Sequence, residues 1–80
     1  MQLRVLYFAV LRDLVEREEE SVDAPPCNVR EFIAWIAEHR PALRGRMGSV
    51  RIARNEVFAY DDEALCDGDV VALIPPVAGG

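Results

Sequence analysis

Few residues of this chain have side chains that could carry out chemistry. One histidine, His39, and two widely separated cysteines, Cys27 and Cys66, are its only imidazole and thiol groups. A metal site or a histidine-based relay needs several such groups at close spacing, and no CxxC pair is present. We therefore expect no metal site, and we expect His39 at a helix C-terminus, where the helix dipole favours it. For the cysteines we expect structural roles, with a sulfur relay as the alternative.

Acidic residues gather between Asp61 and Asp69, but not with the spacing of a calcium-binding loop. We expect a solvated loop there, with a docking patch for a basic partner as the alternative. The glycines form neither a GxGxxG motif nor a P-loop, so no phosphate cradle is predicted.

The unusual feature is the C-terminal end of the sequence. An apolar run over 70–74 leads directly into Pro75-Pro76, then Val77 and Ala78, then Gly79-Gly80. The prolines stiffen the exit from the preceding strand, and the progressively slimmer residues suit insertion into a narrow channel of another protein. The reactive group would be the α-carboxylate of Gly80. A free carboxylate is a poor electrophile and needs ATP-dependent adenylation by a separate enzyme; a frayed tail without a role is the alternative.

The elements that must position this tail follow from the hydrophobic pattern. Apolar residues recur at helical spacing after Asn28, a helix cap with Glu31 three residues later, and the run ends at Pro41. A short helical turn is predicted over 10–16, and strands over 2–9, 18–24, 50–53, 56–60 and 70–74. This order predicts an α+β domain of the ubiquitin-like β-grasp class, a mixed sheet of about five strands crossed by one main helix. Residues 1–74 would form the domain, and residues 75–80 an extended Gly-Gly tail.

A single helix can cover only one face of such a sheet. If Leu3, Val5 and Tyr7 face the helix, alternation places other apolar residues on the open face, which is expected to be polar. These are Leu6, Phe8, Phe58 and Ile74. An apolar open face predicts a partner that covers it, with coverage by loops of the same chain as the alternative.

Composition narrows the classes of function. All nine basic residues are arginine, and 14 acidic residues give a net charge of −5, which disfavours nucleic acid as a partner. No apolar run reaches the roughly 18 residues of a membrane span. No export signal precedes the first predicted strand, so we expect a cytoplasmic protein with reduced thiols.

Residues near both ends of the sequence resemble those of a known family. The segments are Leu6-Tyr7-Phe8-Ala9, Leu11-Arg12-Asp13-Leu14, Asn55, Leu65-Cys66-Asp67-Gly68-Asp69-Val70-Val71-Ala72 and Pro75-Pro76-Val77-Ala78-Gly79-Gly80. In these segments the chain resembles the small, sulfur-carrying subunits of molybdopterin synthase. The Pro-Pro-Val-x-Gly-Gly ending is the most specific part of the resemblance, which rests on element order alone between about residues 17 and 50.

The resemblance implies a function and a set of partners. An adenylating enzyme of the ubiquitin-activating type would attach AMP to the Gly80 carboxylate, and a sulfur donor protein would convert it to a thiocarboxylate. The tail, residues Pro75 to Gly80, would then enter the active site of the large subunit and deliver sulfur to cyclic pyranopterin monophosphate. Two deliveries would build the dithiolene of molybdopterin.

The same resemblance implies a heterotetramer of two small and two large subunits, with the catalytic side chains on the large subunit. This chain alone would not be an enzyme and would hold no permanent cofactor, the ATP being consumed by the activating enzyme. Two alternatives stay open: a sulfur carrier for thiamine or cysteine synthesis, and a ubiquitin-like protein modifier or binding module.

Overall fold

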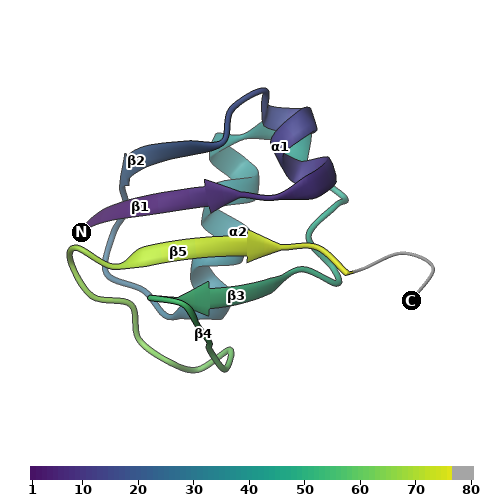
Figure 1. Cartoon of the computed structure of the whole chain (residues 1–80). Coiled ribbons are helices and arrows are strands. Elements are labelled where there is room, and N and C mark those ends of the chain that lie inside the picture. Colours follow the sequence, from purple (N-terminus) through teal and green to yellow (C-terminus); the bar gives the residue numbers. More distant parts are fainter. Residues whose placement is uncertain (77–80) are drawn as a thin grey trace.

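The structure, a computed structural model, describes residues 1–76 and places one long helix against one face of a five-stranded mixed sheet (Figure 1). The strand order is β2-β1-β5-β3-β4; β1 runs parallel to β5, and the other neighbouring pairs are antiparallel. The elements are β1 (Gln2–Tyr7), α1 (Ala9–Val15), β2 (Glu19–Asp23), α2 (Val29–His39), the 3-10 helix η1 (Pro41–Leu43), β3 (Arg51–Arg54), β4 (Val57–Phe58) and β5 (Val70–Ile74). The predicted β-grasp architecture is confirmed.

Three predicted strands are shorter in the structure: β2 covers Glu19–Asp23 of the predicted 18–24, and β1 and β4 are each shortened for a local reason. β1 ends at Tyr7 because Phe8 becomes the N-cap of α1. β4 holds two residues in place of the five predicted, because Asn55 and Glu56 form a turn with φ values of 51° and 72°. Such left-handed conformations reverse the chain tightly and leave little of the segment to pair with β3.

Helix α2 begins and ends where the sequence predicts. The side chain of Asn28 accepts a hydrogen bond from the Glu31 amide, and Glu31 accepts one from the Asn28 amide, which completes a capping box. The helix ends before Pro41, since the residue that precedes a proline is forced out of the helical conformation. In the described part of the chain, neither α-helix has the length and apolar character needed to cross a bilayer.

The core lies between α2 and the sheet. Phe32 and Ile36 of the helix are fully buried against the inward-facing side chains of β1 and β5. These inward residues, all at most 2% exposed, are Leu3, Val5, Tyr7, Val71 and Leu73. The predicted helix-facing side of the sheet is therefore correct.

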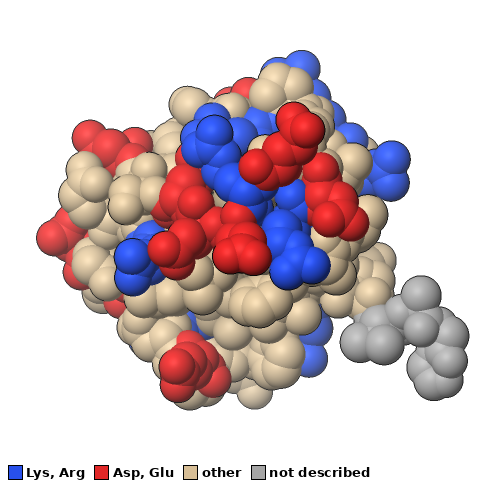
Figure 2. All heavy atoms as spheres, turned by 45° about the horizontal axis from the view of Figure 1, so that its top comes forward, with Lys and Arg blue, Asp and Glu red and all other residues tan. Residues whose placement is uncertain are grey.

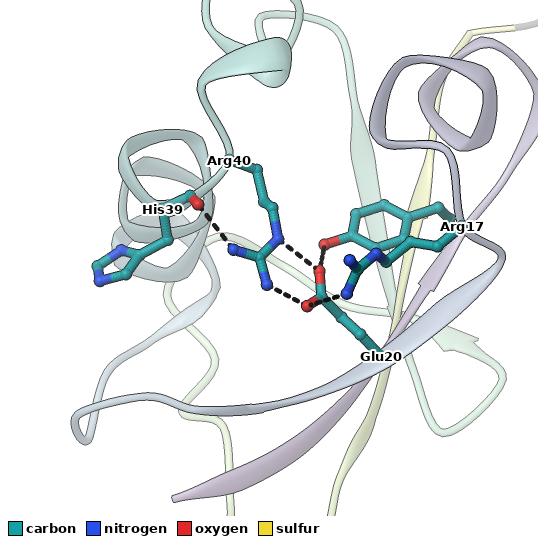
Figure 3. Close-up of polar contacts among 5 residues, drawn as sticks. Arg17, Glu20, His39 and Arg40 are labelled. Atoms are coloured by element: carbon teal, nitrogen blue, oxygen red, sulfur yellow. Dashed lines mark hydrogen bonds and ion pairs between the residues drawn. The ribbon is translucent and has the colours of Figure 1, made fainter.

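One inward-facing position of β2 holds a carboxylate. Glu20 pairs with Val5 across the β1–β2 ladder and therefore shares its face, and only 6% of its side chain is exposed. Its carboxylate accepts hydrogen bonds from the Tyr7 hydroxyl at 2.5 Å, from Arg17 at 3.2 Å and from Arg40, whose Nε lies at 2.7 Å (Figure 3). Because Arg40 directly follows α2, this cluster joins the end of the helix to two strands.

The cluster changes the acidity of its members. Hydrogen bonds from Arg40 and Tyr7 hold the pKa of Glu20 below its usual value, although burial acts in the opposite direction. Burial and the bond to Glu20 raise the pKa of the Tyr7 hydroxyl far above its ordinary value. Both shifts favour an ionised carboxylate and a neutral phenol, which is the arrangement that keeps every bond of the cluster.

We expect Glu20→Gln to lower the free energy of unfolding near neutral pH by about 1–3 kcal/mol, because charge-assisted hydrogen bonds are replaced by weaker ones. Since the native pKa of Glu20 is lowered, its contribution is present above the ordinary pKa of glutamate and is lost as the pH falls through the native pKa. Urea unfolding between about pH 7 and pH 3 should show the difference between wild type and variant shrinking on acidification.

The exposed neighbour Glu19 supplies the control, because its ion pair with Arg4 at 3.4 Å is open to solvent. Glu19→Gln should change stability by less than about 1 kcal/mol. A Glu20→Gln difference that stays constant with pH would contradict the role given to the carboxylate.

Candidate functional site

The strand that leads into the tail is held on both sides. β5 lies in the middle of the sheet, with Leu73 opposite Tyr7 of β1 and also opposite Ile52 of β3. The last pair of the ladder joins Ile74 to Arg51. This backbone is therefore fixed up to residue 74.

Pro75 and Pro76 follow at once, the first half-buried and the second exposed. Because proline has no N–H to donate, the chain cannot extend the ladder past this point. The predicted tail residues Val77, Ala78, Gly79 and Gly80 lie outside the described residues. The sheet thus fixes the backbone up to Ile74, and residues 74–76 form the root of the tail, where the chain leaves the sheet at a defined place.

The other end of β5 is held by hydrogen bonds of two polar side chains, which form the Asn55–Asp69 bracket. Asp69, only 9% exposed, accepts hydrogen bonds from the Cys66 amide at 2.8 Å and from the Asn55 side chain at 3.0 Å. The side-chain oxygen Oδ1 of Asn55 in turn accepts a hydrogen bond from the Val70 amide at 2.9 Å. These residues belong to the segments that carry the family resemblance, and here they hold the loop and the turn that flank the strand. Nothing in the sequence indicated the contact between Asn55 and Asp69, because these residues lie 14 positions apart.

The open face carries a row of apolar side chains. The strand registers place Leu6, Ala72, Ala53 and Phe58 side by side across β1, β5, β3 and β4. The two alanines are buried, at 8% and 7% exposure, beneath their larger neighbours, whereas Phe58 is 50% exposed. No helix of residues 1–76 covers this row (Figure 1).

Ile74 lies on this face two residues beyond Ala72, and its neighbour across the ladder, Arg51, places its guanidinium carbon 4.0 Å from the centre of the Phe58 ring. Phe8 follows β1 at the same end of the sheet and is 45% exposed. The structure therefore brings together the four residues predicted for the open face. Leu6 and Ile74 are half-buried, while Phe8 and Phe58 are half-exposed.

The exposed apolar surface includes three residues that were not predicted from the sequence pattern. Val57 and Tyr60, on either side of Phe58 along the chain, are 69% and 79% exposed, and Val10 on α1 is 46% exposed. The shortness of β4 explains the first two, because a two-residue edge strand has too few neighbours to bury either of its faces.

The histidine and the two cysteines form no common metal-binding group within residues 1–76. His39 ends α2 as expected; its ring stacks on Trp35 with centroids 4.0 Å apart, and its Nδ1 lies 2.9 Å from the Trp35 carbonyl oxygen. Cys27 is half-buried, and burial together with Glu31 raises the pKa of its thiol. Among residues 1–76, no three histidine, cysteine or acidic side chains are placed to hold a metal ion.

A shallow, open depression of about 460 Å³ lies beside β4. Its polar lining combines two arginines with two aspartates, and Arg30 pairs with Asp61 at 3.7 Å. These opposite charges offset each other. The candidate functional site is therefore the rigid root of the tail together with the apolar row beside it.

Comparison with known proteins agrees with this geometry. The sequence model of the ThiS family matches residues 5–80. The chain belongs to this family. It is 37% identical to the molybdopterin synthase sulfur carrier subunit of Chlamydomonas reinhardtii over the full length of both chains. The subunit of the same name from Escherichia coli is also 37% identical, over 98% of this chain and 99% of that protein. The recognition made from the residues at the two ends of the sequence is confirmed.

Solved structures of related proteins share the fold. The putative molybdopterin converting factor subunit 1 of Pyrococcus furiosus superposes with a TM-score of 0.85 at 32% identity, over 96% of this chain and 99% of that one. SAMP1 from Haloferax volcanii superposes with a TM-score of 0.86 at 27% identity over all of both chains. A chain in the complex of subunits 1 and 2 of the Helicobacter pylori molybdopterin-converting factor superposes with a TM-score of 0.69 at 28% identity, again over the whole of both chains.

Proposed function

We propose that this chain is the sulfur carrier subunit of a molybdopterin synthase and carries the sulfur as a thiocarboxylate on Gly80. The observation that carries the proposal is the central strand β5, paired with β1 up to Leu73 and with β3 up to Ile74, and followed at once by Pro75-Pro76. The proposal is supported by relatives that match over their full length and are named as sulfur carrier subunits of this enzyme. Residues 1–74 act as the carrier domain and residues 75–80 as the reactive tail.

The chemistry proceeds in two stages. An ATP-dependent adenylating enzyme joins the Gly80 carboxylate to AMP and releases pyrophosphate. A persulfide of a donor protein then attacks the carbonyl carbon, and AMP leaves with its electron pair. A second thiol reduces the resulting acyl disulfide, so that a thiocarboxylate on Gly80 and a disulfide remain. In the synthase, the thiocarboxylate sulfur forms a bond to a carbon of cyclic pyranopterin monophosphate as an oxygen substituent leaves that carbon. Water then cleaves the acyl carbon–sulfur bond, which returns Gly80 to a carboxylate and leaves the sulfur on the pterin.

This chain supplies the sulfur and its placement, while the catalytic side chains come from the large subunit. Six residues, 75–80, reach at most about 20 Å when extended. This reach lets the carboxylate enter a channel while the domain stays outside it. In this arrangement no side chain of residues 1–76 needs to touch the reacting atoms.

The apolar open face forms the docking surface for the large subunit. Phe8 and Phe58 are the largest exposed members, Leu6 and Ile74 complete the patch, and the root of the tail lies at its edge. Two copies of each subunit would form the complete synthase, a soluble cytoplasmic enzyme. The complex of subunits 1 and 2 from Helicobacter pylori supports a partner of this kind.

Conjugation to other proteins is a second candidate, favoured by the fold shared with SAMP1, the small archaeal modifier protein 1 of Haloferax volcanii. A carrier and a modifier both need an activated C-terminal glycine, but they differ in the acceptor. This chain has no lysine, so it cannot form lysine-linked chains on itself. An accumulated thiocarboxylate favours the carrier, whereas an amide-linked adduct with another protein favours the modifier.

Deletion of Gly80 should abolish sulfur acquisition without loss of the fold, because no core residue lies beyond β5 among the described residues. Intact mass, measured after incubation with ATP, the activating enzyme and a sulfur source, should show exchange of one oxygen for sulfur only in the wild type. Extension of the chain past Gly80 should be equally damaging. A Gly80-deleted protein that still forms a thiocarboxylate and supports molybdopterin synthesis would sink the proposal.

Phe58→Glu should weaken binding to the large subunit by at least about tenfold, because a charge on the docking surface has to be desolvated. The fold should persist, since this side chain is half-exposed. Val5→Glu is the matched contrast, because it buries an unpaired charge in the core and should unfold the domain. Circular dichroism beside a binding titration separates the two effects; unfolding by both variants would refute the assigned faces.

Neither cysteine is expected to carry the sulfur. The pKa of Cys27 is raised, which disfavours the nucleophilic thiolate, and Cys66 lies in the loop before β5, at the end of the strand opposite the tail. The double variant Cys27→Ser, Cys66→Ser should acquire sulfur at Gly80 at the wild-type rate in the same mass assay. Loss of sulfur acquisition by a folded double variant would reveal a thiol relay.

A further inference from the structure

The arginines of this chain divide into two groups. Five of the nine lie within ion-pair distance of a carboxylate: Arg4, Arg17, Arg30, Arg40 and Arg54. The other four have no such partner within residues 1–76, and all are exposed: Arg12, Arg44, Arg46 and Arg51. Arg51 nevertheless lines the depression that also holds Asp61 and Asp62, so Arg12, Arg44 and Arg46 remain as exposed arginines without an acidic partner within residues 1–76 of a chain of net charge −5.

These three tail-root arginines come from two segments that meet at one end of the sheet. That end is marked by Ile74, the residue before the two prolines. Arg12 lies on α1, which begins at the same end because Tyr7 pairs with Leu73. Arg44 and Arg46 lie in the segment between η1, which packs against α1, and the start of β3 (Figure 1, right).

Charge is distributed differently elsewhere on the molecule. On the face around β2 and α1, acidic and basic side chains interleave, and blue groups reach the right-hand edge (Figure 2). At the opposite end of β1, Asp67 accepts a hydrogen bond from the Gln2 amide, and Asp23 is the strand partner of Gln2. The tail-root end therefore combines the unpaired arginines with the exit of the chain; α1 also carries Asp13 there, and Asp23 and Asp67 lie at the far end.

The tail-root arginines are too far from the reacting atoms at Gly80 to act on them directly. The carboxylate of Gly80 lies up to about 20 Å along the chain from the end of β5, beyond the screening length of roughly 8–10 Å at ordinary salt. When the tail is inserted, the tail-root arginines face the protein surface around the opening through which it passes. What they meet there has to be part of the partner.

We propose that the tail-root arginines dock against an acidic rim that surrounds this opening on the large subunit. The inference rests on the proposed function and adds an electrostatic contact to the apolar one. A site for a pterin monophosphate has to be lined with positive charge, and three unpaired arginines would be repelled from its mouth unless carboxylates stand between them. The rim would orient the carrier so that the tail meets the opening, which raises the rate of association more than the final affinity.

The test compares two variants of equal net charge. Arg44→Gln with Arg46→Gln removes two tail-root cations whose side chains form no hydrogen bond within the described residues. Arg30→Glu makes the same change in net charge in the first turn of α2, where a carboxylate suits the helix dipole. Stopped-flow association with the large subunit from the same organism is measured for the full-length proteins from low to high salt.

The double variant should associate about five- to tenfold more slowly than wild type at low salt, and the difference should vanish at high salt. Arg30→Glu should stay within about twofold of wild type at every salt concentration, since its position is remote from the tail root. A double variant that associates as fast as wild type, or an Arg30→Glu variant slowed equally, would overturn the acidic rim. A wild-type chain that does not bind the large subunit would instead overturn the proposed function, so the two failures are distinguishable.

Discussion

The hydrogen bonding of β5 on both of its sides is the constraint on which the rest of this structure depends. A strand in the middle of a sheet cannot shift or fray without breaking two ladders. Its inward side chains Val71 and Leu73 are fully buried against α2, and its outward residues form the centre of the apolar row. One strand therefore sets the core, the open face and the point where the tail begins.

The cluster around Glu20 shows how an inward-facing carboxylate is accommodated. β2 is an edge strand, and a charge that points into the core discourages pairing with another chain. The desolvation of that charge is offset by Arg40, which closes the end of α2, and by the Tyr7 hydroxyl. The same contact fixes the helix relative to two strands, so an edge-protecting residue also has a structural role.

The fold followed from the sequence because its signals are local. Alternation in β1 and β5 predicted both faces, and Asn28 with Glu31 predicted the start of α2. Contacts between distant residues carried no such signal: the Asn55–Asp69 bracket joins residues 14 positions apart, and Glu20 meets Arg40 across 20 positions. The exposure of Val57 and Tyr60 was missed because it depends on the length of β4, which the left-handed turn at Asn55-Glu56 decides.

The pairing of β1 with β5 also bears on how the chain reaches its native state. Arg4 lies opposite Val70, so these parallel neighbours are separated by 66 positions in the sequence (70 minus 4). Closing so large a loop before any contact is gained makes folding slow relative to that of a helical protein of equal size. During synthesis, the middle of the sheet stays empty until residues 70–74 emerge, and a chain cut short before them exposes unpaired edges of β1 and β3. Premature termination would therefore yield an aggregation-prone product rather than a folded domain that lacks its tail, and only chains that reach the tail would compete for the partner.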